Sequence, residues 1–378
     1  MTDGNFYPER LDPIPEDVAE VLGVAEQPII PAETRKGAEE ASSAAIDPEN
    51  ILDLQGLKVS FPILGGVMKR QIGAVKAVAG VDLGIRKGET LGLVGESGCG
   101  KSTLGKAILR LVPAVSGKID YKDGEVDYPD ILSLSPREFK PLRNHLQIVF
   151  QDPYSSLNPA LSIFSSLKRG LEEKGITSAA EQREILGRLF EKVNLHRDYL
   201  NRYPNEFSGG QRQRIAIVRA LSVDPDFIVL DEAVSALDVS VQAQVLDLLK
   251  ELKQERGLTY LFISHNLSVV EYIADRIAVM YLGGIVELTD AETLYADPLH
   301  PYTQALLSAI PVVDPTSRRE RIVLEGDVPS PANPPSGCPF HPRCPIAVPE
   351  CAVSKPELRN LGTGGKEHWV ACFLAEQE

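Results

Sequence analysis

Short apolar runs alternate with amphipathic stretches along the chain from Ile51 onward. The runs TLGLVG, LQIVF, DFIVLD, LTYLFIS and RIAVMYL predict buried β-strands. In the segment VQAQVLDLLKELKQERG, apolar side chains recur on one helical face: Val241, Val245, Leu248, Leu249 and Leu252. Gly257 follows this face and is a suitable helix stop. The alternation of strands and helices favours an α/β fold in which helices pack on a mainly parallel sheet.

The remaining stretches predict three further kinds of segment. Residues 155–225 read as mostly helical and predict an inserted subdomain. From residue 311 the chain becomes rich in proline, which is typical of loops rather than regular structure. Residues 1–50 hold twelve acidic and three basic residues, a charge of −9 out of −14 for the whole chain. Their composition predicts a disordered acidic extension, in which PEDVAEVLGVA could form a short docking helix.

The overall composition narrows the functional class. A net charge of −14 and a pI of about 5.0 argue against a general binder of nucleic-acid backbones, which needs a basic face. The sequence shows no apolar run of about eighteen residues and no basic-then-apolar N-terminus, so it predicts neither a membrane span nor a secretory signal. We therefore expect a cytosolic protein, in which clustered cysteines favour a metal site over disulfides.

The stretch GESGCGKST directly follows the predicted strand TLGLV and fits the phosphate-loop spacing G-x-x-x-x-G-K-[ST]. Glycines let backbone N–H groups wrap a β-phosphate, Lys101 reaches the β- and γ-phosphate oxygens, and Ser102 ligates Mg²⁺. Cys99 occupies a free position and is interpreted as a small filler residue. The expected nucleotide-binding residues are Gly95, Ser97, Gly98, Cys99, Gly100, Lys101, Ser102 and Thr103.

The strand in FIVLDE ends in two carboxylates, Asp231 and Glu232. An acidic pair at a strand end is by itself an ordinary solvated terminus, but beside a phosphate loop it indicates phosphoryl-transfer chemistry. We expect Asp231 to complete the Mg²⁺ shell. We expect Glu232 to act as the general base, or at least to position the attacking water.

The motif Ser208-Gly209-Gly210-Gln211 opens a helix that runs to Leu221, and so forms a second anion-binding helix terminus. One ATP does not need two such termini from one chain. A head-to-tail dimer, in which each SGGQ closes over the partner's γ-phosphate, explains the motif. An ordinary helix N-cap is the alternative, and it would be preferred if the motif stood alone.

Six motifs occur in order: the phosphate loop, Gln151 after LQIVF, SGGQ, LDE, SALD (Ser235 to Asp238) and His265 after LFIS. This order resembles the nucleotide-binding subunit of ABC transporters over residues 51 to about 290. The resemblance implies a P-loop NTPase (ABC ATPase) core at 51–290 with an inserted helical subdomain, binding ATP and Mg²⁺. Ala233 and Asn266 replace the family's usual proline and aspartate, at positions where we expect no loss of chemistry.

The resemblance also assigns roles to the matching residues. Glu232, His265 and Gln151 would form the catalytic set, in which His265 contacts the γ-phosphate. Gln151 would sense Mg²⁺ and water and face the membrane subunits, and the Mg²⁺ ligands would be Ser102, Gln151 and Asp231.

Two further roles concern contacts across the dimer and the adenine of ATP. Asp238 would communicate across the dimer. The adenine would stack on an aromatic residue near the first strand, for which Phe61 is the candidate. A place for Phe61 in the core is an equal alternative, and the stretch that follows it is long for such a loop.

The stretches QDPYSSLNP and HPYTQAL (His300 to Leu306) are similar to the peptide-import branch of this family, and PYSSLNP and VSALDVSVQAQV to the second of its two unlike ATPase subunits. The resemblance implies a second ATPase as heterodimer partner, two membrane-spanning permeases and an extracytoplasmic binding protein. The chain would lie on the cytoplasmic face of the cell membrane and dock near Tyr154 to Leu161. Short peptides are the expected cargo, with glutathione, nickel chelates and sugars as alternatives.

Four cysteines in residues 291–378, at Cys338, Cys344, Cys351 and Cys372, suggest a small cysteine-containing C-terminal domain. Their spacing lacks C-x-x-C pairs and leaves zinc, an iron–sulfur cluster and no metal all open. The resemblance implies a structural 4Fe–4S cluster, with zinc as the rival and His341 and His368 as spare ligands.

Two other functional classes remain as alternatives. A soluble ABC ATPase that acts on nucleic acid or ribosomes is disfavoured by the acidic charge and by HPYTQAL. A lone P-loop kinase or GTPase explains neither SGGQ nor His265.

Overall fold

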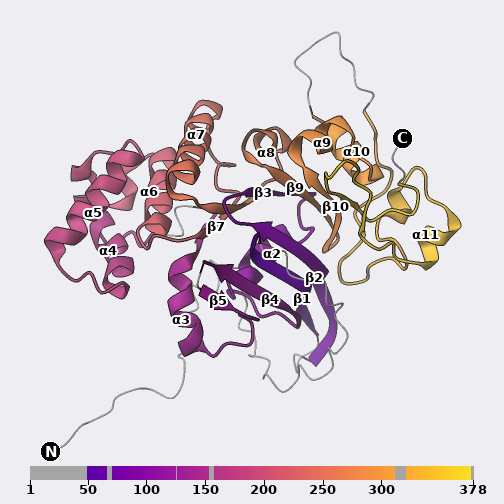
Figure 1. Ribbon diagram of the computed structural model, residues 1–378, viewed down its shortest axis with the longest axis horizontal. Helices are drawn as coiled ribbons and strands as arrows, with labels where there is room; N and C mark the ends of the chain where they lie inside the picture. The colour runs from indigo at the N-terminus through magenta and orange to yellow at the C-terminus, as the bar shows by residue number, and fades with distance from the viewer. Residues whose placement is uncertain (1–48, 66–69, 125, 153–156, 311–320, 376–378) are drawn as a thin grey trace, which may run out of the picture. The chain divides into compact units, whose positions relative to one another are not determined.

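The computed structural model describes residues 49–65, 70–124, 126–152, 157–310 and 321–375 (Figure 1). The predicted acidic extension, with its docking helix, therefore lies outside the described residues except for its last two positions. Among the described residues, no helix combines the length and the apolar character that a membrane crossing requires.

The core is an eight-stranded sheet in the order β11-β12-β10-β9-β3-β8-β7-β6. Its strands are β3 (Thr90–Val94), β6 (Leu146–Val149), β7 (Phe227–Asp231), β8 (Thr259–Ile263), β9 (Arg276–Tyr281), β10 (Gly284–Asp290), β11 (Arg359–Asn360) and β12 (His368–Val370). The five apolar runs coincide with β3, β6, β7, β8 and β9, and these strands pair in parallel. The prediction of an α/β fold with a parallel sheet is confirmed.

A second, antiparallel sheet has the order β2-β1-β4-β5. It comprises β1 (Asn50–Gly65), β2 (Arg70–Arg86), β4 (Ser116–Asp123) and β5 (Val126–Tyr128). The sequence did not predict this sheet, because its long strands alternate buried with half-exposed positions and lack continuous apolar runs.

Helices flank the core sheet and gather in a separate helical group (Figure 1). Those around the sheet are α2 (Lys101–Ile108), α3 (Pro136–His145), α7 (Val239–Arg256), α8 (Leu267–Ile273), α9 (Ala291–Ala296) and α10 (Pro301–Ser308). The helical group consists of α4 (Ile163–Glu173), α5 (Ala179–Lys192), η2 (Arg197–Asn201), η3 (Pro204–Glu206) and α6 (Gly209–Leu221). Serines at positions 162, 178 and 208 cap α4, α5 and α6.

Helix α7 matches the helical face predicted from the sequence. Val245, Leu248, Leu249 and Leu252 are buried, and Val241 is half-buried. The helix ends at Gly257, which adopts the left-handed conformation typical of a helix C-terminus.

The C-terminal region, which we define as residues 321–375, is mostly irregular, as its proline content predicts, and also contains η4 (His341–Arg343) and α11 (Pro349–Val353). The sequence did not predict that its strand β12 pairs with β10 and so extends the core sheet. A separate small domain built on cysteines is therefore not confirmed.

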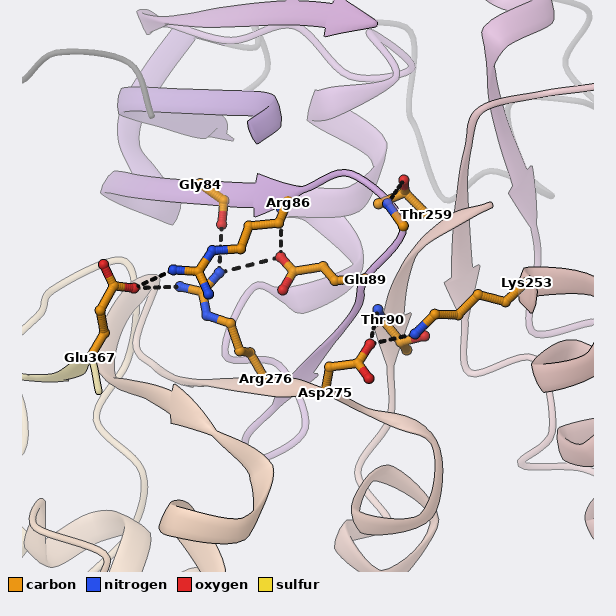
Figure 2. A network of polar contacts seen from close by, with 10 residues as sticks. Gly84, Arg86, Glu89, Thr90, Lys253, Thr259, Asp275, Arg276 and Glu367 are labelled. Atoms are coloured by element: carbon orange, nitrogen blue, oxygen red, sulfur yellow. Dashed lines mark hydrogen bonds and ion pairs between the residues drawn. The ribbon is translucent and has the colours of Figure 1, made fainter. Parts of the chain in front are cut away.

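An ion-pair network also attaches the C-terminal region to the core, as Figure 2 shows. Glu367 accepts a hydrogen bond of 2.8 Å from Arg86, and Arg276 lies 3.8 Å from the same carboxylate oxygen. Arg276 is buried and also lies 3.3 Å from Glu89, whose carboxyl pKa is raised by burial. Arg86 of β2 and Arg276 of β9 thus compensate the charges of two acids, Glu89 before β3 and Glu367 of the C-terminal region.

Candidate functional site

The phosphate loop connects β3 to α2 and is packed too tightly for side chains at two of its glycines. A Cβ at Gly100 would stand 2.1 Å from the carbonyl oxygen of Ala77, and one at Gly95 would stand 2.2 Å from that of Met280. Both glycines also have positive φ angles, of 112° and 150°. The loop therefore lies between β2 and β9 in a shape that requires glycine.

Lys101 is buried and donates hydrogen bonds to the carbonyl oxygens of Gly95 at 2.8 Å and Glu96 at 3.0 Å. Its ammonium group therefore lies within the loop that would cradle the phosphates. Cys99 is buried as well, and burial raises the pKa of its thiol. The carbonyl oxygen of Cys99 accepts the N–H of Gly283, which ties the loop to the turn between β9 and β10.

Ser102 and Asp231 meet at the ends of α2 and β7. The Ser102 hydroxyl donates to Asp231 Oδ1 at 2.6 Å. Burial raises the pKa of the Asp231 carboxyl, against the effect of this hydrogen bond. A hydroxyl and a carboxylate are the oxygen ligands that Mg²⁺ prefers, so this pair fits the predicted metal site.

The three predicted catalytic residues lie together although they come from distant parts of the chain. Gln151 Nε2 donates to Glu232 Oε2 at 2.7 Å, and His265 Nδ1 lies 3.1 Å from Glu232 Oε1. The backbone of Glu232 has a φ of 48°, and its carbonyl oxygen accepts the Ser235 hydroxyl. Its N–H donates to Ile263 of β8. The Glu232 carboxylate is thus oriented by groups that follow β6 and β8.

The SGGQ motif forms a capping box at the start of α6. The Ser208 hydroxyl accepts the N–H of Gln211, and Gln211 Oε1 accepts the N–H of Ser208. Within one chain the motif therefore forms an ordinary helix N-cap, which was the alternative interpretation of the sequence. A Cβ at Gly209 would meet nothing within 4 Å, so this glycine faces open space at the helix start.

The remaining predicted residues occupy positions near these elements. Asp238 is the N-cap residue of α7. Phe61 is half-buried in β1 and pairs with Val75 of β2, two residues from Ala77, whose carbonyl approaches the phosphate loop. Phe61 thus lies on the hairpin that contacts the loop.

The phosphate loop has two contacts that the sequence did not predict, one with the C-terminal region and one with α10. Arg343 donates to both carboxylate oxygens of Glu96, at 2.8 and 3.1 Å. The Tyr302 hydroxyl accepts the Glu96 N–H at 2.8 Å. The hydrogen bonds to Glu96 raise the pKa of the Arg343 guanidinium. The "HPR" and "HPYTQAL" stretches carry these residues, but no sequence pattern indicates their partner.

The four C-terminal cysteines line one small cavity of about 10 Å³. Within the ranges that the structure describes, no group of three or more His, Cys, Asp or Glu side chains could hold a metal ion. The prediction that Cys338, Cys344, Cys351 and Cys372 bind a 4Fe–4S cluster, or zinc in its place, is therefore wrong.

Other contacts occupy the side chains that the metal prediction needed. Burial raises the pKa of the Cys338 and Cys344 thiols, which favours the protonated form over the thiolate that ligates metals. His341 Nδ1 lies 2.9 Å from the carbonyl oxygen of Cys338, and His368 Nε2 lies 2.7 Å from the buried Glu287. Hydrogen bonds, strand pairing and burial of Phe340 stabilise this region instead.

Two protein families match the chain. Residues 78–235 match the family described as "ABC transporter". Residues 286–351 match "Oligopeptide/dipeptide transporter, C-terminal region", which includes the HPYTQAL stretch.

Two named relatives are similar to this chain over most of its length. The oligopeptide transport ATP-binding protein AppF of Bacillus subtilis is 51% identical over 333 residues, covering 87% of this chain and 99% of AppF. A putative peptide import ATP-binding protein of Brucella ovis is 53% identical over 299 residues, covering 79% of this chain and 92% of that protein.

Solved structures share the arrangement of the core. The dimeric structure of MJ0796, a bacterial ABC transporter cassette, matches with a TM-score of 0.56 and 27% identity, covering 64% of this chain and 98% of that one. A dimeric post-hydrolysis state of MJ0796 bound to ADP and Pi matches with a TM-score of 0.55 and 26% identity, covering 64% and 98%. The chain has a phosphate loop, the adjacent acids Asp231 and Glu232, and relatives that are 51% and 53% identical to it. It therefore belongs to the ABC transporter family as one of its ATP-hydrolysing subunits.

Proposed function

We propose that this chain hydrolyses ATP to drive the import of short peptides through an ABC transporter. The observation that carries the hydrolytic part is the orientation of Glu232 by Gln151 and His265 at the end of the sheet that carries the phosphate loop. The cargo is inferred from the relatives, whose names describe oligopeptide transport and peptide import. The match of residues 286–351 to the oligopeptide-type region supports the same cargo over nucleic acid or ribosomes.

The proposed chemistry assigns one role to each group. Glu232 positions the attacking water and accepts its proton, while Gln151 and His265 orient the carboxylate and the γ-phosphate. Mg²⁺, which Ser102, Gln151 and Asp231 would ligate, would supply charge stabilisation of the transferring phosphoryl group. Lys101 and the loop glycines bind the β- and γ-phosphates, and Phe61 stacks on the adenine.

The SGGQ motif supports a proposed assembly with a second ATPase subunit. Gly209 faces open space at a helix N-terminus, so a second ATPase subunit could bring its γ-phosphate there, with Asp238 near the contact. We propose a heterodimer of unlike ATPases that closes on ATP and reopens after hydrolysis, at the cytoplasmic face of the membrane. Two permeases and an extracytoplasmic binding protein would complete the transporter. Residues 154–156 of the proposed permease contact lie outside the described residues, while Leu161 is 42% exposed.

We propose a matching division of the chain. Residues 51–290 would form the nucleotide-binding domain, with a helical subdomain at about 155–225, and residues 291–378 the oligopeptide-type C-terminal region. The helices α4 to α6, which span residues 163–221, support this subdomain. Residues 1–50 would be an acidic extension.

Reconstitution tests this function. The chain is placed in vesicles with the second ATPase, both permeases and the binding protein, and ATP hydrolysis is measured with a labelled short peptide, with nucleic acid and with neither. We expect ATP-dependent peptide uptake and stimulation of hydrolysis by the peptide alone. Uptake of no peptide, or stimulation by nucleic acid only, would refute the proposal.

A further inference from the structure

Glu96 of the phosphate loop forms hydrogen bonds with three residues, and two of these are distant from the loop in sequence. Its carboxylate accepts both hydrogen bonds of Arg343, its N–H donates to the Tyr302 hydroxyl, and its carbonyl oxygen accepts from Lys101. Arg343 lies 247 residues away in sequence and Tyr302 lies 206 residues away. Glu96, which contacts Lys101, is therefore held in place by Arg343 and Tyr302, and both of these follow the core strands β3 to β10 in the sequence.

The two remote residues are themselves rigidly placed. The Arg343 side chain is only 8% exposed, and Tyr302 is fully buried. The rings of Tyr281, Tyr302 and Phe340 pack against one another with centroids 4.7 to 5.5 Å apart. The Tyr281 hydroxyl lies 3.5 Å from Arg343. A guanidinium that is buried and bidentate gives a directional contact that a lysine could not reproduce.

The turn between β9 and β10 provides a second link. Gly283 N–H donates to the carbonyl oxygen of Cys99 in the loop, while Tyr281, which ends β9, packs on Phe340 of the C-terminal region. Both the start and the middle of the phosphate loop are thus joined to elements that the C-terminal region covers. A displacement of that region would release Glu96 and change the position of Lys101.

We propose that Arg343 of the C-terminal region and Tyr302 of α10, which packs on Phe340 of that region, are positioning residues of the ATP site. Through them, docking of the C-terminal region sets the shape of the phosphate loop. Lys101 gives up its contact with Glu96 when it turns to a phosphate, and the two remote residues then keep Glu96 in place. Because coupling between two equilibria is reciprocal, nucleotide binding in turn stabilises the docked C-terminal region. The ATPase core and the oligopeptide-type region would thus act as one unit.

The test uses the full chain and a fluorescent, non-hydrolysable ATP analogue with Mg²⁺. Arg343→Gln removes the ion pair, and Tyr302→Phe removes one hydroxyl. Arg359→Gln is the matched control for the first, since Arg359 lies in the same region and its side chain donates to the Cys372 carbonyl oxygen rather than to the phosphate loop. Tyr295→Phe is the control for the second, since its hydroxyl bonds to Leu267.

We expect Arg343→Gln and Tyr302→Phe each to weaken analogue binding by about 2- to 30-fold, the range typical of coupling through intermediate residues, and both controls to bind normally. Glu96→Gln combined with Arg343→Gln should be no worse than either change alone, because both remove the same contact. Arg343→Lys should be intermediate. Hydrogen exchange at residues 337–345 should slow when the analogue binds to wild type, and slow less in Tyr302→Phe.

Normal analogue binding by folded Arg343→Gln and Tyr302→Phe would overturn the inference, as would effects of Glu96→Gln and Arg343→Gln that add. Should Arg343→Gln fail to fold, Glu96→Gln and Tyr302→Phe decide alone. These outcomes are separate from the proposed transport function, which peptide uptake tests and which requires Lys101 whatever Arg343 does.

Discussion

The Ser102 hydroxyl and the Asp231 carboxylate lie 2.6 Å apart, although 129 residues separate them in sequence. The phosphate loop and the end of β7 are thus brought to the same edge of the sheet, where the carboxyl ends of parallel strands meet. The Asp231 carboxyl is buried, which raises its pKa and makes its charged form costly in the protein without nucleotide. This cost yields a prediction that links stability to function.

Asp231→Asn should stabilise the nucleotide-free protein while abolishing stabilisation by Mg²⁺–ATP. An aspartate whose pKa is raised by folding destabilises the fold above that pKa, and acid relieves the cost. The neutral asparagine removes it, so we expect the melting temperature at pH 7 to rise by on the order of 2 °C. Thermal melts with and without Mg²⁺–ATP measure both effects.

The exposed Asp198 provides the control, since Asp198→Asn should change neither melt. A nucleotide-free Asp231→Asn protein less stable than wild type would contradict the account of this carboxyl.

The adjacent glycines of the SGGQ motif should respond differently to alanine. A Cβ at Gly210 would stand 2.5 Å from Val241 Cγ1, whereas one at Gly209 meets nothing. Gly210→Ala should therefore lower the stability by about 1–3 kcal/mol through overpacking. Gly209→Ala should melt like wild type but impair the proposed ATP-driven association with a second ATPase, because its methyl group would enter the open space that we propose for the partner's phosphate.

Melting curves and light scattering with ATP measure the two properties separately. Unimpaired association of Gly209→Ala would remove the support for a shared site at this helix terminus.

The elements that the sequence predicts are those in which burial or backbone conformation restricts the residue types that can occur. Strand β7 could be read from its apolar run, and α7 from its periodic face, because both bury their side chains against the core. The phosphate loop could be read because its backbone conformation requires glycine at Gly95 and Gly100.

The parts that the sequence did not reveal depend on long-range contacts. Strand β12 has only three residues and exists because β10 offers it an edge, which no local pattern signals. The bidentate pair of Arg343 and Glu96 likewise joins two ordinary surface-type residues that folding brings together. The metal prediction for the four cysteines was wrong because it rested on their number and on the family resemblance. Burial raises the pKa of Cys338 and so favours its protonated thiol, which the sequence does not show.

His300 should make the fold sensitive to acid. It is fully buried, which lowers its pKa from 6.5 to about 4, while its Nδ1 accepts the N–H of Tyr302. The unfolded chain therefore binds the proton first as pH falls, so the stability present above pH 6.5 is lost progressively towards pH 4. Between pH 7 and pH 5 this loss amounts to roughly 2 kcal/mol.

His300→Asn keeps a capping acceptor but does not titrate, so its stability should fall by less over the same pH range. Denaturant unfolding at several pH values measures the difference. His196→Asn is the matched control, since His196 also caps a helix but is exposed. Identical pH profiles for His300→Asn and wild type would show that His300 does not carry this effect.

Glu232, held by Gln151 and His265, is the group that we expect to activate water. The most direct test of this role is a single-turnover measurement on the assembled transporter, comparing Glu232→Gln with the exposed control Glu251→Gln. We predict that Glu232→Gln binds ATP normally and hydrolyses it about 10²–10⁴-fold more slowly, as expected for loss of a positioned base, while Glu251→Gln hydrolyses at the wild-type rate. Hydrolysis by Glu232→Gln at the wild-type rate would contradict the account.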